Sequence, residues 1–172
     1  MKLFKNQKGN ALSQSKGFTL IELLVVVGIL AVLFAITLIA INPARQFSQA
    51  NNTKRSSDVN AILNAVNQYM VDHQGTLPAV LSGCTAAVPC TLTDDPAITP
   101  SINICAMLVS NYLAALPADP LTNNGVAVIE AECSNGVTTY NTGYTIYQST
   151  TNNRVTVAAP AAELSASISV TR

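Results

Sequence analysis

The residue of this sequence that is best placed to do chemistry is a single carboxylate at the start of a long apolar run. Glu22 is followed by nineteen residues without a charge, Leu23 to Ile41. An acidic side chain in hydrocarbon costs roughly 2.5–3.5 kcal/mol on insertion scales, so an intramembrane glutamate marks a candidate functional site. A cut between Gly17 and Phe18 would supply its cation, because the new α-amine, with an ordinary pKa of about 7.7–8.0, is largely protonated at neutral pH.

The apolar run is long enough to cross a membrane. Nineteen residues at about 1.5 Å each span roughly 28 Å, close to the hydrocarbon thickness of about 30 Å. The alternative is a buried core helix of a soluble domain, which a chain of 172 residues rarely has room to hide. We therefore expect a single-pass membrane helix.

The segment before this run is basic and polar. Its lysines are Lys2, Lys5, Lys8 and Lys16. In a secretory signal peptide the cleavage site follows the apolar core, whereas here the candidate cut precedes it, so the apolar run stays with the mature protein. Because positive residues near a span remain cytoplasmic, the bulk of the chain is predicted to lie outside the cytoplasm.

Around the candidate cut the sequence resembles a known signal. Residues 17–27 read GFTLIELLVVV, and they are similar to the processing and polymerisation signal of type IV prepilins and of the pseudopilins of type II secretion. In that family a membrane peptidase removes the leader after the glycine and N-methylates the new first residue. The resemblance implies that Gly17 and Phe18 form the cleavage and methylation site. It also implies that Glu22 neutralises the N-terminal amine of a neighbouring subunit during assembly.

The same resemblance implies an α+β, pilin-like fold, in which a long N-terminal helix packs on a small antiparallel sheet. The corresponding segments are a leader (1–17), the transmembrane and polymerisation half of the helix (18–41), its amphipathic half (42–74) and an extracytoplasmic globular head (75–172). An apolar stripe at spacings of three and four supports the second half: Val59, Ile62, Leu63, Val66, Tyr69, Met70 and His73. Pro43 predicts a kink or local unwinding, and Gly75 and Pro78 predict the helix end.

The rest of the chain predicts shorter elements. We expect a connecting loop over 76–100, a helix over 101–116, and strands over 126–133, 137–140, 144–149 and 154–158. Turns are expected at 134–136, 141–143 and 152–153, and residues 167–171 predict an edge strand or a frayed tail.

The four cysteines all lie beyond the span: Cys84, Cys90, Cys105 and Cys133. An even number in an extracytoplasmic domain favours disulfides, of which three pairings are possible. We favour Cys84 with Cys90, which would close a small loop, and Cys105 with Cys133, which would tie the short helix to the sheet. A zinc site is disfavoured because the closely spaced cysteine pairs of zinc ribbons are absent.

Charge and motifs argue against most other functions. Removal of the leader leaves five Lys and Arg against nine Asp and Glu, a net charge of 5 − 9 = −4, so no general nucleic-acid binding is expected. Neither a HExxH pair nor a phosphate-binding glycine loop is present, and the lone His73 is interpreted as structural. Glu163 is the only carboxylate side chain after Cys133, so the acidic calcium loop of major pseudopilins has no counterpart. We predict no enzyme, metal or cofactor.

The resemblance to type IV prepilins therefore implies a structural subunit of a type IV pilus-like filament. Its partners would be further copies and related pilins, the prepilin peptidase and an inner-membrane assembly platform. It would sit in the cytoplasmic membrane before assembly and in a cell-surface or periplasmic filament afterwards. Two alternatives stay open: a pseudopilin of a type II secretion or DNA-uptake machine, and a single-span membrane-anchored binding protein that does not polymerise.

Overall fold

A computed structural model describes residues 17–133 and 139–172 of the chain. The chain divides into two compact units, Met1–Asn42 and Pro43–Arg172. The leader lysines, the turn expected at 134–136 and the first half of the strand expected at 137–140 lie outside the described residues. The second half of that strand, residues 139–140, is not a strand in the structure. Each unit is described on its own below.

In residues 17–42 of the first unit the structure describes one helix, α1, which spans Leu20–Ile41 and buries none of its 22 residues. It is long and apolar enough to cross a membrane. Apart from Glu22, its only polar side chain is Thr37, whose hydroxyl donates to the Phe34 carbonyl at 2.9 Å. A hydroxyl satisfied within its own helix can enter lipid without an orphaned polar group.

The second unit begins with helix α2, Pro43–Asp72. The interruption expected at Pro43 is present as one non-helical residue, because Asn42 adopts a left-handed conformation with φ of 47°. Proline is well suited to the first helical position, where its missing N–H would have no partner in any case. At the other end the chain leaves the helix through Gly75, at φ of 81°, whose N–H donates to the Met70 carbonyl at 2.7 Å.

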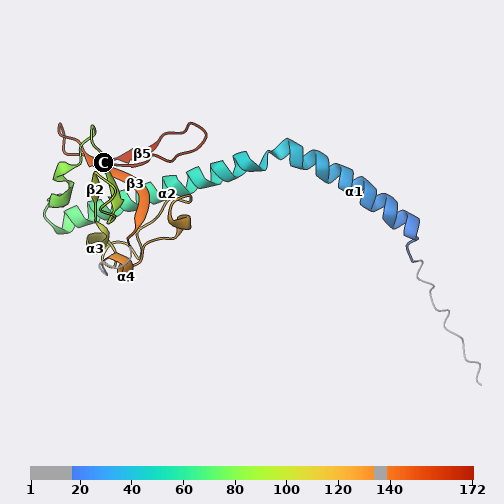
Figure 1. The fold of residues 1–172 in the computed structure, drawn as a ribbon, viewed down its shortest axis with the longest axis horizontal. Helices are drawn as coiled ribbons and strands as arrows, with labels where there is room; N and C mark the ends of the chain where they lie inside the picture. Colours follow the sequence, from blue (N-terminus) through green and yellow to red (C-terminus); the bar gives the residue numbers. More distant parts are fainter. Residues whose placement is uncertain (1–16, 134–138) are drawn as a thin grey trace, which may run out of the picture. The chain divides into compact units, whose positions relative to one another are not determined.

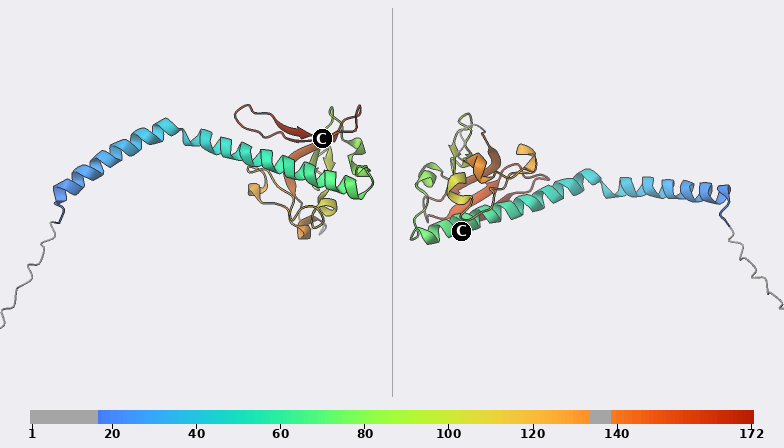
Figure 2. Two further views of the ribbon diagram at one scale, coloured as in Figure 1. Left: turned by 180° about the vertical axis from the view of Figure 1, so that it is seen from behind. Right: turned by 90° about the horizontal axis from the view of Figure 1, so that it is seen from below.

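Five strands form one sheet in the order β2-β1-β3-β4-β5. Their bounds are β1 Cys90–Thr93, β2 Ser101–Ile102, β3 Asn141–Gln148, β4 Val155–Ala159 and β5 Ile168–Thr171. All neighbouring pairs are antiparallel except β1 with β2. Helix α2 contacts β4 and β5, and Figures 1 and 2 show it lying along the sheet. The α+β, pilin-like fold is confirmed.

The core lies between α2 and the sheet. From α2 it takes Val59, Ile62, Leu63, Ala65 and Val66, and β3 and β4 contribute Tyr144, Ile146, Val155 and Val157. Tyr69 and Met70 pack at its margin, and His73 is exposed. Most of the predicted stripe therefore faces the core.

The other helical elements described in this unit are short: η1 Ala79–Gly83, α3 Cys105–Leu108, η2 Asn123–Gly125 and α4 Glu130–Cys133. Here the structure corrects two sequence predictions. The helix expected over 101–116 is a single turn, because residues 101–102 pair with β1 and Ser110 takes a positive φ of 74°. The strand expected over 126–133 is wrong: Val128 makes one bridge to Leu116, and the chain then turns into α4.

Two further corrections concern the sheet. The loop expected over 76–100 contains β1, a strand whose alternate threonines give too weak an apolar pattern to be recognised. The turn expected at 141–143 is the start of β3, where Gly143 at φ of 74° keeps the strand pairing despite an irregular register. The later strands were predicted correctly, and 167–171 is an edge strand rather than a frayed tail.

Candidate functional site

The first turn of α1 holds Glu22 through a reciprocal pair of hydrogen bonds. The Thr19 hydroxyl accepts from the Glu22 backbone N–H at 3.2 Å. One Glu22 carboxylate oxygen, Oε2, accepts from the Thr19 backbone N–H at 2.8 Å and from its hydroxyl at 2.7 Å. This arrangement is a capping box, which satisfies two helix-terminal donors at once. The sequence analysis missed it, although the Thr-x-x-Glu spacing was a sufficient signal.

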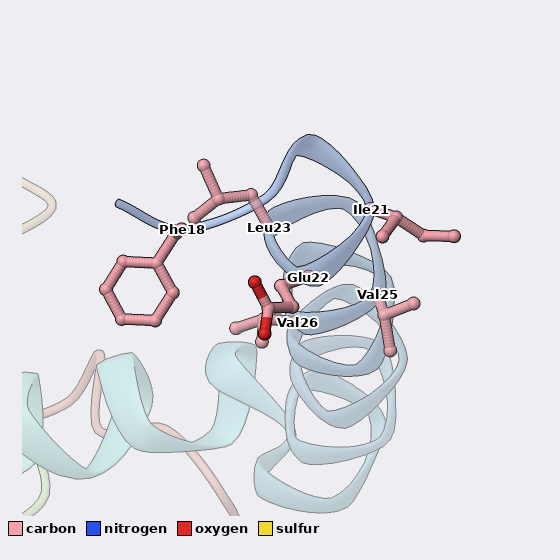
Figure 3. A pocket seen from close by; sticks show the side chains of 6 residues that line it. All are labelled: Phe18, Ile21, Glu22, Leu23, Val25 and Val26. Carbon is pink, nitrogen blue, oxygen red and sulfur yellow. The ribbon is translucent and has the colours of Figure 1, made fainter. Parts of the chain in front are cut away.

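Figure 3 shows how the side chains of this turn are distributed. The Phe18 ring and the Glu22 carboxylate project to the same side, with Val26 one turn further along, while Ile21 and Val25 project to the other. Together with Leu23 these residues line a shallow, mainly apolar hollow. Gly17 and Phe18 precede the helix and are exposed, so the bond between them is accessible.

The geometry leaves Glu22 able to bind a further cation. Both Thr19 donors reach the same oxygen, and no hydrogen bond from the described residues reaches the other oxygen, Oε1. Glu22 is also the only ionisable side chain in residues 17–42. A cut after Gly17 would place an ammonium group on the residue next to Thr19. An ammonium and a carboxylate that meet in a low-dielectric environment stabilise each other only when both are present.

The four cysteines form two disulfides, and they are the two that the sequence analysis favoured. Cys84 is bonded to Cys90 and Cys105 to Cys133, with Cα–Cα distances of 5.3 and 5.2 Å. The first joins the end of η1 to β1, and the second joins α3 to α4. The second bond was expected to reach the sheet, and this detail is wrong because residues 130–133 form a helical turn.

A buried polar network of the second unit is centred on Arg55, a residue of α2 that the sequence analysis did not single out. Its side chain is 0% exposed. Its Nε and Nη2 donate to the two carboxylate oxygens of Asp119 at 2.6 and 3.1 Å, and its Nη1 donates to Glu163 at 2.9 Å. The hydrogen bond to Asp119, opposed by burial and aided by Glu163, raises the pKa of the guanidinium. A bidentate pair of this kind fixes both charge and orientation.

Glu163 itself lies in the loop between β4 and β5 and binds the first turns of α2. Its carboxylate accepts from Ser48 Oγ at 2.8 Å and from Asn51 Nδ2 at 2.9 Å, and its backbone carbonyl accepts from Asn52 Nδ2 at 2.8 Å. Hydrogen bonds from Asn51, Ser48 and Arg55, in that order, lower the pKa of Glu163. No pattern in the sequence pointed to this contact, because its partners are 108 to 115 residues apart.

Two more contacts connect α2 to the rest of the second unit. Lys54 Nζ donates to the carbonyls of Ala118 and Gly125 at 3.3 and 3.1 Å, which fixes the loop that contains η2. The Tyr144 hydroxyl donates to the Asp58 carboxylate at 2.8 Å. Desolvation raises the pKa of Asp58, against the effect of that hydrogen bond. Across residues 17–133 and 139–172, no three His, Cys, Asp or Glu side chains are grouped so as to hold a metal.

Comparison with known proteins gives one result. Residues 12–38 match the family model described as the prokaryotic N-terminal methylation motif. No curated protein and no solved structure matched the chain. The motif is the signature of type IV prepilins and pseudopilins, and it includes Gly17, Phe18 and Glu22. The chain thus carries that signature on a pilin-like fold.

Proposed function

We propose that this protein is a subunit of a type IV pilus-like filament, cleaved after Gly17 and assembled through α1. The observation that carries the proposal is that α1 buries none of its residues within the chain and bears the methylation motif at its start. An apolar helix without a partner in its own chain needs lipid or other copies to cover it. Lipid covers it before assembly, and neighbouring α1 helices cover it in the filament.

In this proposal cleavage and assembly are chemically coupled. In the uncut chain the Phe18 nitrogen is a neutral amide, so two such helices would bring together carboxylates that no N-terminal amine neutralises. Cleavage converts the Phe18 nitrogen to an ammonium group. The Glu22 oxygen that no hydrogen bond from the described residues reaches, Oε1, can then accept a hydrogen bond from the Phe18 ammonium of a neighbouring subunit. The pair favours one axial register between helices, because any other register leaves charge in a low-dielectric core. The motif is typical of structural proteins, and we assign the head no catalytic role.

The proposal is tested by replacing Glu22 with glutamine. Glutamine is also a capping-box acceptor, so Glu22→Gln keeps the bonds to Thr19 and removes only the charge. We expect cleaved protein to accumulate in the membrane at wild-type levels with few or short filaments, as counted by electron microscopy.

Thr19→Ala is the matched control. It keeps the carboxylate and removes the cap, at a cost of about 1 kcal/mol to the first turn, and we expect it to form filaments. Filaments of Glu22→Gln as long and as frequent as those of the wild type would contradict the pairing. A protein that inserts and is cleaved, but never polymerises even as wild type, would instead be a membrane-anchored binding protein.

A further inference from the structure

The loop between β4 and β5, residues 160–167, lies against the beginning of α2. In Figures 1 and 2 it runs beside the helix toward the Pro43 end. Glu163 fixes it there through Ser48, Asn51 and Asn52. Glu163 is the only charged residue of the loop, and Arg55 neutralises it. The loop therefore presents no unpaired charge at this end of the unit.

The tip of the loop holds Leu164, although its backbone conformation disfavours leucine and its side chain is not buried. The Ala166 N–H donates to the Glu163 carbonyl at 3.1 Å, and the two residues between them, Leu164 and Ser165, have positive φ of 58° and 56°. This is the pattern of a type I′ turn, which favours Asn and Gly. The Leu164 side chain is nevertheless 51% exposed. Backbone strain that serves no packing inside the chain is a pointer to a function outside it.

A second large apolar side chain is exposed at the same end of α2. Phe47 is 71% exposed and immediately precedes Ser48, which binds Glu163 at 2.8 Å. Side chains on a helix lean toward its N-terminus, so Phe47 leans toward Pro43. Phe47 and Leu164 are called the Phe47–Leu164 surface below.

Chain connectivity limits how far this surface can be from a bilayer that α1 spans. Two steps through the non-helical Asn42, at no more than about 3.3 Å each, and four helical steps at about 1.5 Å place Phe47 within about 13 Å of Ile41. The headgroup layer beyond the hydrocarbon is about 5–8 Å thick on each side. A phenylalanine that leans back from this position reaches that layer.

We propose that the Phe47–Leu164 surface rests in the headgroup layer of the membrane and orients the head on it before assembly. The inference rests on the membrane insertion of α1, which is part of the proposed function. Lipid is the occupant because it is present at this distance from Ile41 whenever α1 is inserted, and because the loop offers apolar side chains without free charge. Burial of such side chains at the acyl boundary favours attachment.

The chain contains no tryptophan, so a single introduced tryptophan reports its own surroundings. Leu164→Trp and Phe47→Trp would be made in the full chain and reconstituted in phosphatidylcholine vesicles brominated near the top of the acyl chains. We expect each to lose most of its emission to bromine quenching. Because Phe47 lies on a helix, Phe47→Trp still reports on the surface if the substitution in Leu164→Trp changes the conformation of the turn.

Two further variants serve as controls. Val71→Trp, at the other end of α2 and 79% exposed in the wild type, is expected to keep its emission. Phe34→Trp, within α1, is expected to be quenched and reports insertion independently.

Quenching at Phe34 without quenching at either surface position would overturn the inference and leave membrane insertion standing. Quenching as strong at Val71 would also overturn it, because the contact would not be confined to this surface. Absence of quenching at Phe34 would contradict the proposed function as well. The tryptophan emission of Leu164→Trp could instead shift to the blue as more protein is reconstituted per vesicle, without any quenching by bromine. That result would assign the surface to contact with a second copy of the chain.

Discussion

Helices α1 and α2 follow each other in the chain, yet they are stabilised by different means. All 22 residues of α1 are exposed and nearly all are apolar. The 30 residues of α2 are mostly polar, and six of them are buried against the rest of their unit. The stability of α2 is thus set within the chain, whereas α1 depends on an environment that the chain itself does not supply. Changes to the head should therefore unfold α2 and leave α1 helical in a micelle.

All five tyrosines lie in the second unit: Tyr69, Tyr112, Tyr140, Tyr144 and Tyr147. Their near-ultraviolet circular dichroism reports only that unit, while far-ultraviolet circular dichroism reports both helices. The full chain in micelles, unfolded by urea, can therefore separate the two regions. The four predictions below use this measurement, ordered from the largest expected effect to the smallest.

Loss of the Arg55 side chain should have the largest effect. Arg55→Ala leaves the carboxylate of Asp119 buried without its cation, and breaking one side of a buried pair typically costs about 3–5 kcal/mol. We expect the tyrosine transition to move to much lower urea while the helical signal of α1 survives. Arg154→Ala, at an exposed turn, is the control and should change stability by less than about 0.5 kcal/mol. An equal shift in both variants would contradict the role given to Arg55.

The disulfides should differ in their contribution to the head. Their sequence separations are 28 residues for Cys105–Cys133 and 6 for Cys84–Cys90. Loop-closure entropy then predicts losses of about 4 and about 2 kcal/mol on replacement of each pair by alanine. The two double variants would be compared by the same urea unfolding. A larger loss for the Cys84–Cys90 pair would show that the unfolded-state argument fails here.

Leu164→Asn should stabilise the head slightly. A left-handed residue other than glycine or asparagine costs roughly 1–2 kcal/mol, and asparagine tolerates this conformation. We expect a gain of about 1 kcal/mol in the unfolding free energy together with weaker attachment to vesicles. Leu121→Asn, which also replaces an exposed leucine, is the control for polarity alone. A loss of stability on Leu164→Asn would mean that the leucine has a packing role within the chain.

The smallest effect is expected from the titration of Glu163, which is partly exposed to solvent. Because its pKa is lowered in the folded state from an ordinary 4.5, its contribution is complete above that value and is lost as the pH falls through the folded pKa. Asp58 has a raised pKa and contributes with the opposite sign, since its folded form binds a proton more readily. Glu163→Gln should therefore reduce the loss of stability between neutral and acidic pH. An unchanged pH profile would exclude Glu163 as its source.

The comparison of the two helices also shows what the sequence could predict. The α1 helix follows from an uninterrupted apolar run, and the core stripe of α2 and the later strands follow from local periodicity. Cysteine pairing could be favoured because close spacing limits the geometry of Cys84 and Cys90.

The errors arise where long-range contacts override local pattern. Arg55 was not singled out from the sequence, because its burial depends on Asp119 and Glu163, which are 64 and 108 residues away. The helix expected over 101–116 had the right spacing, but pairing of β2 with β1 removed its first residues. Where a strand was expected over 126–133, the chain forms α4. Two hydrogen bonds close this turn: the Glu132 carboxylate accepts from the Ile129 N–H, and the Glu132 N–H donates to the Ile129 carbonyl. At the candidate site, Glu22 was identified from its place at the start of the apolar run. Its role in the capping box was missed because the Thr19-x-x-Glu22 spacing was not considered.

The central claim is that α1 enters a filament only after the leader has been cleaved after Gly17 and Phe18 has become the methylated N-terminus. Mass spectrometry of the N-terminal peptide from sheared, purified filaments tests this directly. We predict a chain that begins at Phe18 and carries one N-methyl group, with Gly17→Trp retaining its leader and absent from filaments. Assembled protein that still carries residues 1–17 would contradict the account.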